Sequence, residues 1–392
     1  MNYREFDGLD WKASALGFGC MRLPTVGDDR SNIHGPEAEE MLHHAIEHGV
    51  NYLDSGYGYH DGASEKFLGR ALKGGYREQV RLATKMPCWE IEEHSDFEKY
   101  FSEQLERLQT DYLDFYLLHG LRRERWDKMR ELDYFSWAEQ AMDDGRIGHL
   151  GFSFHDDLDV FKEIVDGYDN WTFCQIQYNY MDIDNQAGTK GLKYAASKGL
   201  AVVIMEPLLG GRLVDPPQEV QEMWDSAPQE RTPADWALQW LWNQPEVSVV
   251  LSGMSTMQQV RENLASADVS EVGSLSEQEL EVIARVREKY EELCPVPCTQ
   301  CEYCLPCPNE LNIPRLLQML NKGVMYNALE DARRRYDRMS DEEKAAACKQ
   351  CHECEEACPQ QIPISEWMVH IHEVMTKEMP LEECLEGAPS VD

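Results

Sequence analysis

The chain has 392 residues, with 72 acidic side chains against 37 basic ones and a formal net charge of −35. Its apolar fraction of 42% is enough for a large hydrophobic core, which excludes a disordered chain. The acidity argues against binding to nucleic acid or to an anionic membrane surface, because both attract clustered Lys and Arg. Since the sequence has neither an apolar run of about 18 residues nor a signal-peptide core, we expect a cytoplasmic protein with no membrane span.

Short apolar runs recur along the first 270 residues and alternate with stretches of helical periodicity. The predicted strands are 15–20, 51–54, 80–85, 113–119, 149–153, 173–178, 201–206 and 248–252. The helices predicted between them include 36–48, 97–108, 158–165 and 233–242. Eight strand–helix units at this spacing favour an α/β fold of the closed (β/α)8 type, a TIM barrel. A doubly wound sheet is the alternative, but no Gly-x-Gly-x-x-Gly follows the first strand.

Cysteine is concentrated in the last 99 residues, which hold ten of the 13 cysteines. Eight of them form two regular runs, each closed by a proline: Cys298, Cys301, Cys304 and Cys307, and then Cys348, Cys351, Cys354 and Cys358. Runs of this kind are typical of proteins that hold two 4Fe–4S clusters. Zinc is the alternative, but it needs four thiolates in two pairs rather than two evenly spaced quartets.

In two-cluster ferredoxins the last cysteine of each run binds the other cluster. By that resemblance, one cluster uses Cys298, Cys301, Cys304 and Cys358, and the other uses Cys348, Cys351, Cys354 and Cys307. The first run is one residue short before its fourth cysteine, so Cys294 is an alternative ligand.

The residues around the cysteines predict helices. Pro314 can open one helix, and Ser340 with Glu343 forms a capping box before another. A further capping box at Ser276 begins a connector helix that ends near Glu292. We therefore expect a barrel over 1–275, a helical connector over 276–297 and a small α-helical ferredoxin-like domain over 298–392. In that domain we expect core packing, rather than cofactor contact, from Leu316, Leu317, Met319 and Leu320.

Polar residues end three successive predicted strands. Asp54, Lys85 and His119 stand at these ends, and Tyr59 follows Asp54 by five residues. The carboxyl ends of barrel strands hold the site in this fold, so we expect these four side chains to be catalytic. A phenol is a poor acid at neutral pH, but a cation such as Lys85 favours the phenolate, and Asp54 would hold that lysine in place.

These segments resemble the aldo-keto reductases over about residues 10–270. The matching stretches are 49–54, Tyr59, 62–65, 69–72, 82–85, 114–119, 175–179 and 262–263. Together with the C-terminal cysteines, the chain is similar to the ferredoxin-fused branch of that family. The resemblance implies reduction of a small-molecule carbonyl by NAD(P)H, with Tyr59 as general acid and His119 orienting the carbonyl. Three tryptophans could form walls of the site, but we expect them to pack in the core instead: Trp89, Trp126 and Trp171.

The same resemblance implies where NADP or NAD binds. It assigns Ser153 and Gln175 to the nicotinamide carboxamide, and Gln259, Glu262 and Asn263 to other parts of the cofactor. Separately, backbone N–H groups in the loops after the seventh and eighth strands are candidates to bind phosphate, at Leu208, Gly210, Gly211, Gly253 and Ser255. Three positions depart from the family pattern. Phe154 replaces an asparagine, Met205 replaces an aromatic residue, and Gln259 replaces the basic residue that binds the 2′-phosphate. Arg261 and Arg212 are candidate replacements for that missing cation.

A nicotinamide passes two electrons as hydride, whereas each cluster passes one, and this leaves three hypotheses for function. The first is an NAD(P)H-dependent carbonyl reductase with clusters outside its turnover. The second is an anaerobic electron-transfer oxidoreductase whose clusters exchange electrons with a barrel-bound flavin or substrate. The third is a non-catalytic nicotinamide or redox sensor, which would not need the intact catalytic set. A redox protein is a candidate partner, and the acidic surface as a whole favours a basic one.

Overall fold

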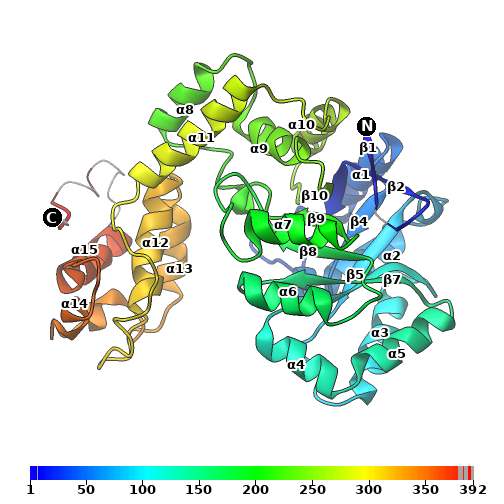
Figure 1. The fold of residues 1–392 in the computed structure, drawn as a ribbon, viewed down its shortest axis with the longest axis horizontal. Coiled ribbons are helices and arrows are strands. Elements are labelled where there is room, and N and C mark those ends of the chain that lie inside the picture. The colour runs from blue at the N-terminus through cyan, green and yellow to red at the C-terminus, as the bar shows by residue number, and fades with distance from the viewer. Residues whose placement is uncertain (7, 378–382, 384–386, 390–392) are drawn as a thin grey trace. The chain divides into compact units, whose positions relative to one another are not determined.

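The computed structural model describes residues 1–392 except 7, 378–382, 384–386 and 390–392 (Figure 1). The chain divides into two compact units. The first comprises Met1–Leu209 with Asp235–Ser276, and the second comprises Gly210–Ala234 with Glu277–Asp392. The segment 210–234, which the sequence analysis placed with the barrel, is therefore grouped with the second unit, where Arg231 forms an ion pair with Glu279.

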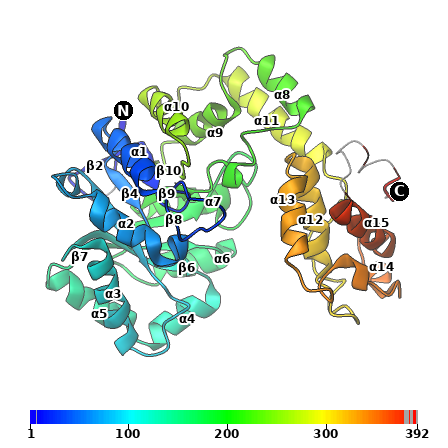
Figure 2. The same ribbon diagram turned by 180° about the vertical axis from the view of Figure 1, so that it is seen from behind.

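The first unit is a closed barrel of eight parallel strands (Figures 1 and 2). The strands are β3 (Leu16–Gly19), β4 (Tyr52–Asp54), β5 (Arg81–Met86), β6 (Leu113–Leu121), β7 (Ile147–Phe154), β8 (Phe173–Gln177), β9 (Ala201–Met205) and β10 (Val247–Ser252). They neighbour one another in chain order, and β10 pairs with β3 to close the barrel. All eight predicted strands are confirmed, with ends that move by one or two residues, and the doubly wound alternative is wrong.

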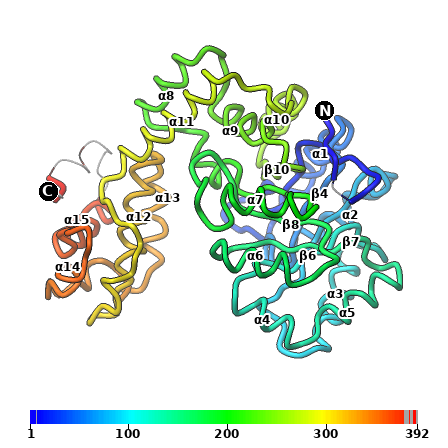
Figure 3. The backbone as a smooth tube through the Cα atoms, in the orientation of Figure 1, coloured from blue at the N-terminus to red at the C-terminus, as the bar shows by residue number. Residues whose placement is uncertain are grey.

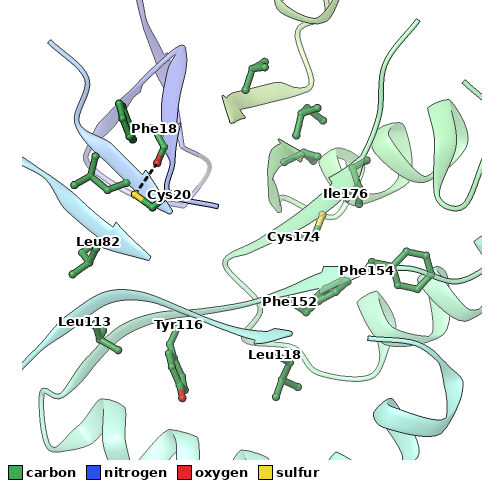
Figure 4. Close-up of a cluster of buried hydrophobic side chains, with 14 of the residues drawn as sticks. Phe18, Cys20, Leu82, Leu113, Tyr116, Leu118, Phe152, Phe154, Cys174 and Ile176 are labelled. Atoms are coloured by element: carbon green, nitrogen blue, oxygen red, sulfur yellow. Dashed lines mark hydrogen bonds between the residues drawn. The ribbon is translucent and has the colours of Figure 1, made fainter. Parts of the chain in front are cut away.

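Helices connect the strands. They are α1 (Gly35–Glu47), α2 (Ala63–Ala71), α3 (Ser95–Leu108), α4 (Arg123–Glu131), α5 (Tyr134–Asp143), α6 (Leu158–Asp166), α7 (Gly188–Ser197), α9 (Pro233–Trp242) and α10 (Met257–Asp268). The four helices predicted in this region are confirmed. Outward-facing strand residues such as Phe152 and Cys174 pack with the apolar faces of these helices in the main core (Figure 4). Burial of this apolar layer is the dominant stabilising term of the barrel.

A second apolar cluster fills the inside of the barrel. An unpredicted hairpin, β1 (Tyr3–Glu5) and β2 (Lys12–Ser14), precedes the barrel, and Phe6 from its turn is fully buried against Phe115. Gly151 is needed in this crowded interior because a Cβ there would lie 2.5 Å from the Phe173 ring. The interior residues that lead up to the polar strand ends are Tyr52, Ala83, Leu117 and Phe173.

The second unit is helical, and Figure 3 traces the long irregular stretch that carries its first cysteine run. Its helices are α8 (Gln218–Asp225), α11 (Glu277–Glu292), α12 (Ile313–Met325), α13 (Leu329–Asp337), α14 (Glu353–Glu356) and α15 (Ile364–Thr376). The connector helix and the helix at Pro314 are confirmed. Leu316, Leu317 and Leu320 are buried in the core of this unit, as predicted, and Met319 packs against it partly buried.

The α-helix predicted after Ser340 is wrong. The Ser340 N–H does donate to the Glu343 carboxylate at 3.0 Å, as a capping box requires. However, Lys344 and Cys348 are both extended, so only the three-residue turn Ala345–Ala347 forms between them. No helix in the described part of the chain is long and apolar enough to cross a membrane.

Candidate active site

Strand alternation explains why four polar side chains meet inside the barrel. In a strand, residues two apart face the same side. Asp54, Lys85, His119 and Gln175 each lie two residues after an interior apolar residue of β4, β5, β6 or β8. The apolar cluster fills the barrel below them, and these residues form the polar layer above it. The sequence-predicted catalytic strand ends are thereby brought to one face of one barrel.

A buried ion pair is the centre of this layer. The Lys85 ammonium donates to Asp54 Oδ1 at 2.6 Å and to the Ser55 carbonyl oxygen. Lys85 is 1% exposed and Asp54 is 2% exposed. Burial lowers the pKa of Lys85, but Asp54 and Tyr59 together outweigh that effect, and the net pKa is raised. The ammonium is therefore held charged at neutral pH.

Tyr59 contacts this ammonium directly. The Lys85 Nζ donates to the Tyr59 hydroxyl oxygen at 3.1 Å. Burial raises the pKa of Tyr59 and Lys85 offsets part of the rise, so the net shift is upward. Lys85 alone was expected to favour the phenolate, but burial outweighs it. The phenol consequently keeps its proton at neutral pH, while the cation beside it stabilises the anion that remains after donation.

His119 faces Tyr59 edge to face, with ring centroids 5.8 Å apart and an interplanar angle of 76°. Burial, followed by the nearby Lys85 charge, lowers the pKa of His119 well below its usual value. The imidazole is therefore neutral, and its buried Nδ1 has no hydrogen-bond partner among the described residues. The core packing expected of Trp89 is wrong, because this side chain is 41% exposed and its ring contacts that of His119, with centroids 5.0 Å apart.

Trp126 and Trp171, the two other tryptophans considered as site walls, are both buried in the core, as expected.

A buried network behind the site was not predicted. The Gln104 amide donates to the Lys85 carbonyl oxygen at 3.0 Å and to Glu65 Oε1 at 2.6 Å. Glu65 also accepts from Thr84 at 2.6 Å and pairs with Arg107 at 3.2 Å. These bonds fix the end of β5 and so position Lys85. Gln104 and Arg107 lie on α3, and nothing in a single sequence distinguishes them from ordinary helix residues.

The predicted nicotinamide-carboxamide residues are neighbours. Ser153 on β7 is in register with Gln175 on β8, and both are buried. The Ser153 hydroxyl oxygen accepts from the Gly120 N–H at 2.7 Å, whereas Gln175 Oε1 has no partner among the described residues. Phe154 packs outward against Phe161 of α6, with ring centroids 5.0 Å apart.

The other residues predicted to bind the cofactor belong partly to the first unit and partly to the second. The Ser255 N–H donates to Gln259 Oε1 at 2.7 Å and the Asn263 amide donates to Ser252 at 2.9 Å, so these side chains have internal partners. Glu262 is exposed and accepts from Gln258. Gly253 is exposed and Leu208 is partly buried, both in the first unit. Gly210 and Gly211 have positive φ angles and belong to the second unit, as does Arg212.

The eight run cysteines surround two small cavities in the second unit. One is lined by Cys298, Cys301, Cys304 and Cys358. The other is lined by Cys307, Cys348, Cys351 and Cys354. Cys294 lines neither cavity, and its thiol donates to the Val296 carbonyl oxygen at 3.3 Å.

The spacing of these thiols bears on which metal group they fit. No three Cys, His, Asp or Glu side chains of the described residues are close enough to share a single metal ion. Each set of four instead lines a cavity. A 4Fe–4S cluster takes four cysteine thiolates, so each cavity offers the number of ligands that one cluster needs.

The chain is similar to known families over most of its length. Residues 15–288 match the model described as the aldo/keto reductase family, and residues 297–362 match a 4Fe-4S dicluster domain. L-galactose dehydrogenase of Arabidopsis thaliana is 28% identical over 320 residues, which cover 74% of this chain and 95% of that protein.

Solved structures are similar too. The aldo-keto reductase AKR11C1 from Bacillus halodurans is 27% identical with a TM-score of 0.61, covering 73% of this chain and 96% of that one. An aldo-keto reductase from Klebsiella pneumoniae in complex with NADPH shares the fold at 23% identity and a TM-score of 0.59, with the same coverage.

The barrel, the tyrosine–lysine–aspartate–histidine set in its mouth and these matches define an oxidoreductase. The chain belongs to the aldo/keto reductase family, and a 4Fe-4S dicluster domain with eight cysteines follows its barrel. The resemblance first drawn from strand-end motifs and cysteine spacing is confirmed.

Proposed function

We propose that the barrel reduces a small carbonyl compound with hydride from NADH or NADPH, and that Tyr59 donates the proton. The contact of 3.1 Å between Lys85 Nζ and the Tyr59 hydroxyl carries this proposal. Asp54 fixes the lysine, and the raised pKa of Tyr59 keeps the phenol protonated until a carbonyl oxygen accepts its proton. Lys85 then stabilises the phenolate.

The cofactor site is supported by an unpartnered buried atom. A bound NADH or NADPH would supply the hydride. Gln175 Oε1 is buried beside the catalytic layer without a hydrogen bond, and it fits the N–H donors of a carboxamide. The aldo-keto reductase from Klebsiella pneumoniae was solved in complex with NADPH, which supports a nicotinamide cofactor here. Because Gln259 is uncharged, NADH and NADPH are both to be tested.

The substrate is proposed to bind beside Trp89 and His119, whose rings contact each other with centroids 5.0 Å apart. Neutral His119 can hydrogen-bond a carbonyl oxygen without adding charge to the site. The half-exposed indole of Trp89 offers an apolar wall beside it. The Arg125 guanidinium lies 5.6 Å from the Trp89 ring centroid and holds that wall by a cation–π contact.

The clusters are assigned to the two cysteine sets and stand outside carbonyl turnover in this proposal. Hydride transfer moves two electrons together, so carbonyl reduction requires no one-electron step. The crossed ligand sets are supported by the cavities, since each contains three cysteines of one run and the fourth of the other. Cys294 is not a ligand in this assignment.

Replacing Tyr59 with Phe tests the proposed role. The variant should lose about 10²- to 10⁴-fold in kcat for aldehydes and ketones, the usual contribution of a general acid. Tyr57→Phe is the matched control, because Tyr57 lies on the same loop and its hydroxyl contacts Glu103 instead, at 3.2 Å. Reduction of a one-electron dye by the clusters should be unchanged in both variants. Equal carbonyl turnover by Tyr59→Phe and the wild type would show that Tyr59 is not the proton donor.

A further inference from the structure

A basic groove on the second unit takes no part in the proposed carbonyl chemistry. It has a volume of about 680 Å³ and lies along α12 and α13, next to the first cysteine run. Its cationic lining residues are Arg212, Arg315, Lys322, Arg335 and Arg338. Only Glu302 and Asp331 contribute acidic groups to the lining. The groove is therefore a local excess of positive charge on a chain whose net charge is −35.

Part of this positive charge is not neutralised within the groove. Asp331 pairs with Arg212 at 3.2 Å, with Arg335 at 3.0 Å and with Arg334, which is not part of the lining, at 3.8 Å. One carboxylate therefore serves three guanidinium groups. Lys322 and Arg338 are exposed, and neither forms an ion pair with another described residue. These two side chains are available to a negatively charged ligand.

The groove adjoins the cavity assigned to the first cluster. Glu302 and Pro314 line both the groove and the cavity bounded by Cys298, Cys301, Cys304 and Cys358. Cys301 is itself exposed. The next residue after Glu302, Tyr303, is 68% exposed, which offers an aromatic anchor of the kind that protein interfaces use. The basic groove, the exposed ring of Tyr303 and the thiol of Cys301 therefore lie close together on the surface of this unit.

We infer that this groove docks an acidic one-electron carrier protein, which exchanges electrons with the first cluster. One electron would pass from the reduced carrier to the oxidised cluster. The carrier would lose this electron and the cluster would gain it. No bond forms or breaks and no proton moves. The inference depends on the dicluster domain and not on carbonyl reduction in the barrel, so either can fail without the other.

Local charge decides the docking position on such an acidic chain. Exposed charges separated by more than about 8 Å are largely screened at physiological ionic strength. The excess acid elsewhere therefore acts weakly on a docked carrier, while Lys322 and Arg338 act at close range. Acidic surfaces repel an acidic carrier, whereas the groove attracts it and sets its orientation.

The test measures binding of a purified acidic flavodoxin to the full-length, cluster-loaded protein, with basic cytochrome c as the comparison. Lys322→Glu/Arg338→Glu should weaken flavodoxin binding by about tenfold or more and slow association, because the reversed charges repel it. Lys66→Glu/Lys73→Glu is the matched control, since it makes the same charge change at two exposed lysines of the first unit. Its effect should stay within about twofold, because neither lysine lines the groove.

Folding is checked by circular dichroism and iron content. Should the charge-reversed protein fail to load its clusters, Lys322→Gln/Arg338→Gln replaces it, with an expected loss of about threefold or more. Equal weakening by the groove and control variants would overturn the inference. So would a wild-type protein that binds cytochrome c at the groove in preference to flavodoxin, or one that takes only inorganic pyrophosphate there.

Discussion

Removing the Lys85 ammonium tests the buried ion pair on which the active site depends. In Lys85→Met the Asp54 carboxylate, 2% exposed, loses its charged partner, and its other oxygen already has none among the described residues. Breaking a buried pair on one side costs about 3–5 kcal/mol, because the remaining charge is buried without compensation. We therefore expect Lys85→Met to lower the free energy of unfolding of the barrel by that amount.

The double variant Lys85→Met/Asp54→Asn separates charge from packing. It leaves a neutral amide, whose unmet hydrogen bonds cost only about 1–3 kcal/mol. The double variant should therefore be more stable than Lys85→Met alone, although it carries more changes. Both variants should be inactive in carbonyl reduction, since Tyr59 loses its neighbouring cation in each.

Urea unfolding of the full chain, followed by tryptophan fluorescence, measures the difference. Eight of the ten tryptophans lie in the first unit, so the signal reports mainly on the barrel. A carboxyl whose pKa is raised by folding costs stability as the pH rises above its unfolded value. The deficit of Lys85→Met should therefore shrink on acidification from about pH 8 to about pH 5. A double variant less stable than Lys85→Met would refute the reasoning.

Three further predictions concern the proton donor, the cofactor and the clusters. The rate of carbonyl reduction should be constant from about pH 6 to about pH 9 and fall above that range. The reason is that the pKa of Tyr59 is raised and His119 stays neutral. A change in rate centred near pH 6.5 would contradict this prediction. Gln175→Leu should weaken nicotinamide binding by about tenfold, measured by titration, through loss of one buried acceptor. Cys351→Ser should lose about half of the bound iron in iron analysis, whereas Cys294→Ser should lose none.

The barrel could be predicted from the sequence for a specific physical reason. Parallel strands are buried on both faces, so each appears as an unbroken apolar run, and a polar residue at the end of such a run stands out. Asp54, Lys85 and His119 were found in this way. The same alternation places Phe154 on the outer face of its strand, where it packs against a helix. The comparison with the family pattern showed only that an asparagine is replaced at this position, not that the new side chain faces away from the site.

The features that the sequence did not predict are contacts between residues far apart in the chain. The hydrogen bonds of Gln104 to β5 join residues about 20 positions apart, and the ion pair of Arg212 with Asp331 joins residues 119 positions apart. No local pattern encodes either. The capping box at Ser340 led to the opposite kind of error. Its hydrogen bond forms as predicted, but no α-helix follows, because the backbone is already extended at Cys348.

The most direct test of carbonyl reduction follows a deuterium label from the cofactor. NADH or NADPH carrying deuterium at the hydride position is given to the anaerobic, cluster-loaded protein with a carbonyl substrate. If hydride passes directly to the substrate, the alcohol carries one deuterium on the former carbonyl carbon and the clusters keep their oxidation state. An alcohol without label, formed while the clusters change oxidation state, would contradict this account and favour one-electron chemistry through a flavin.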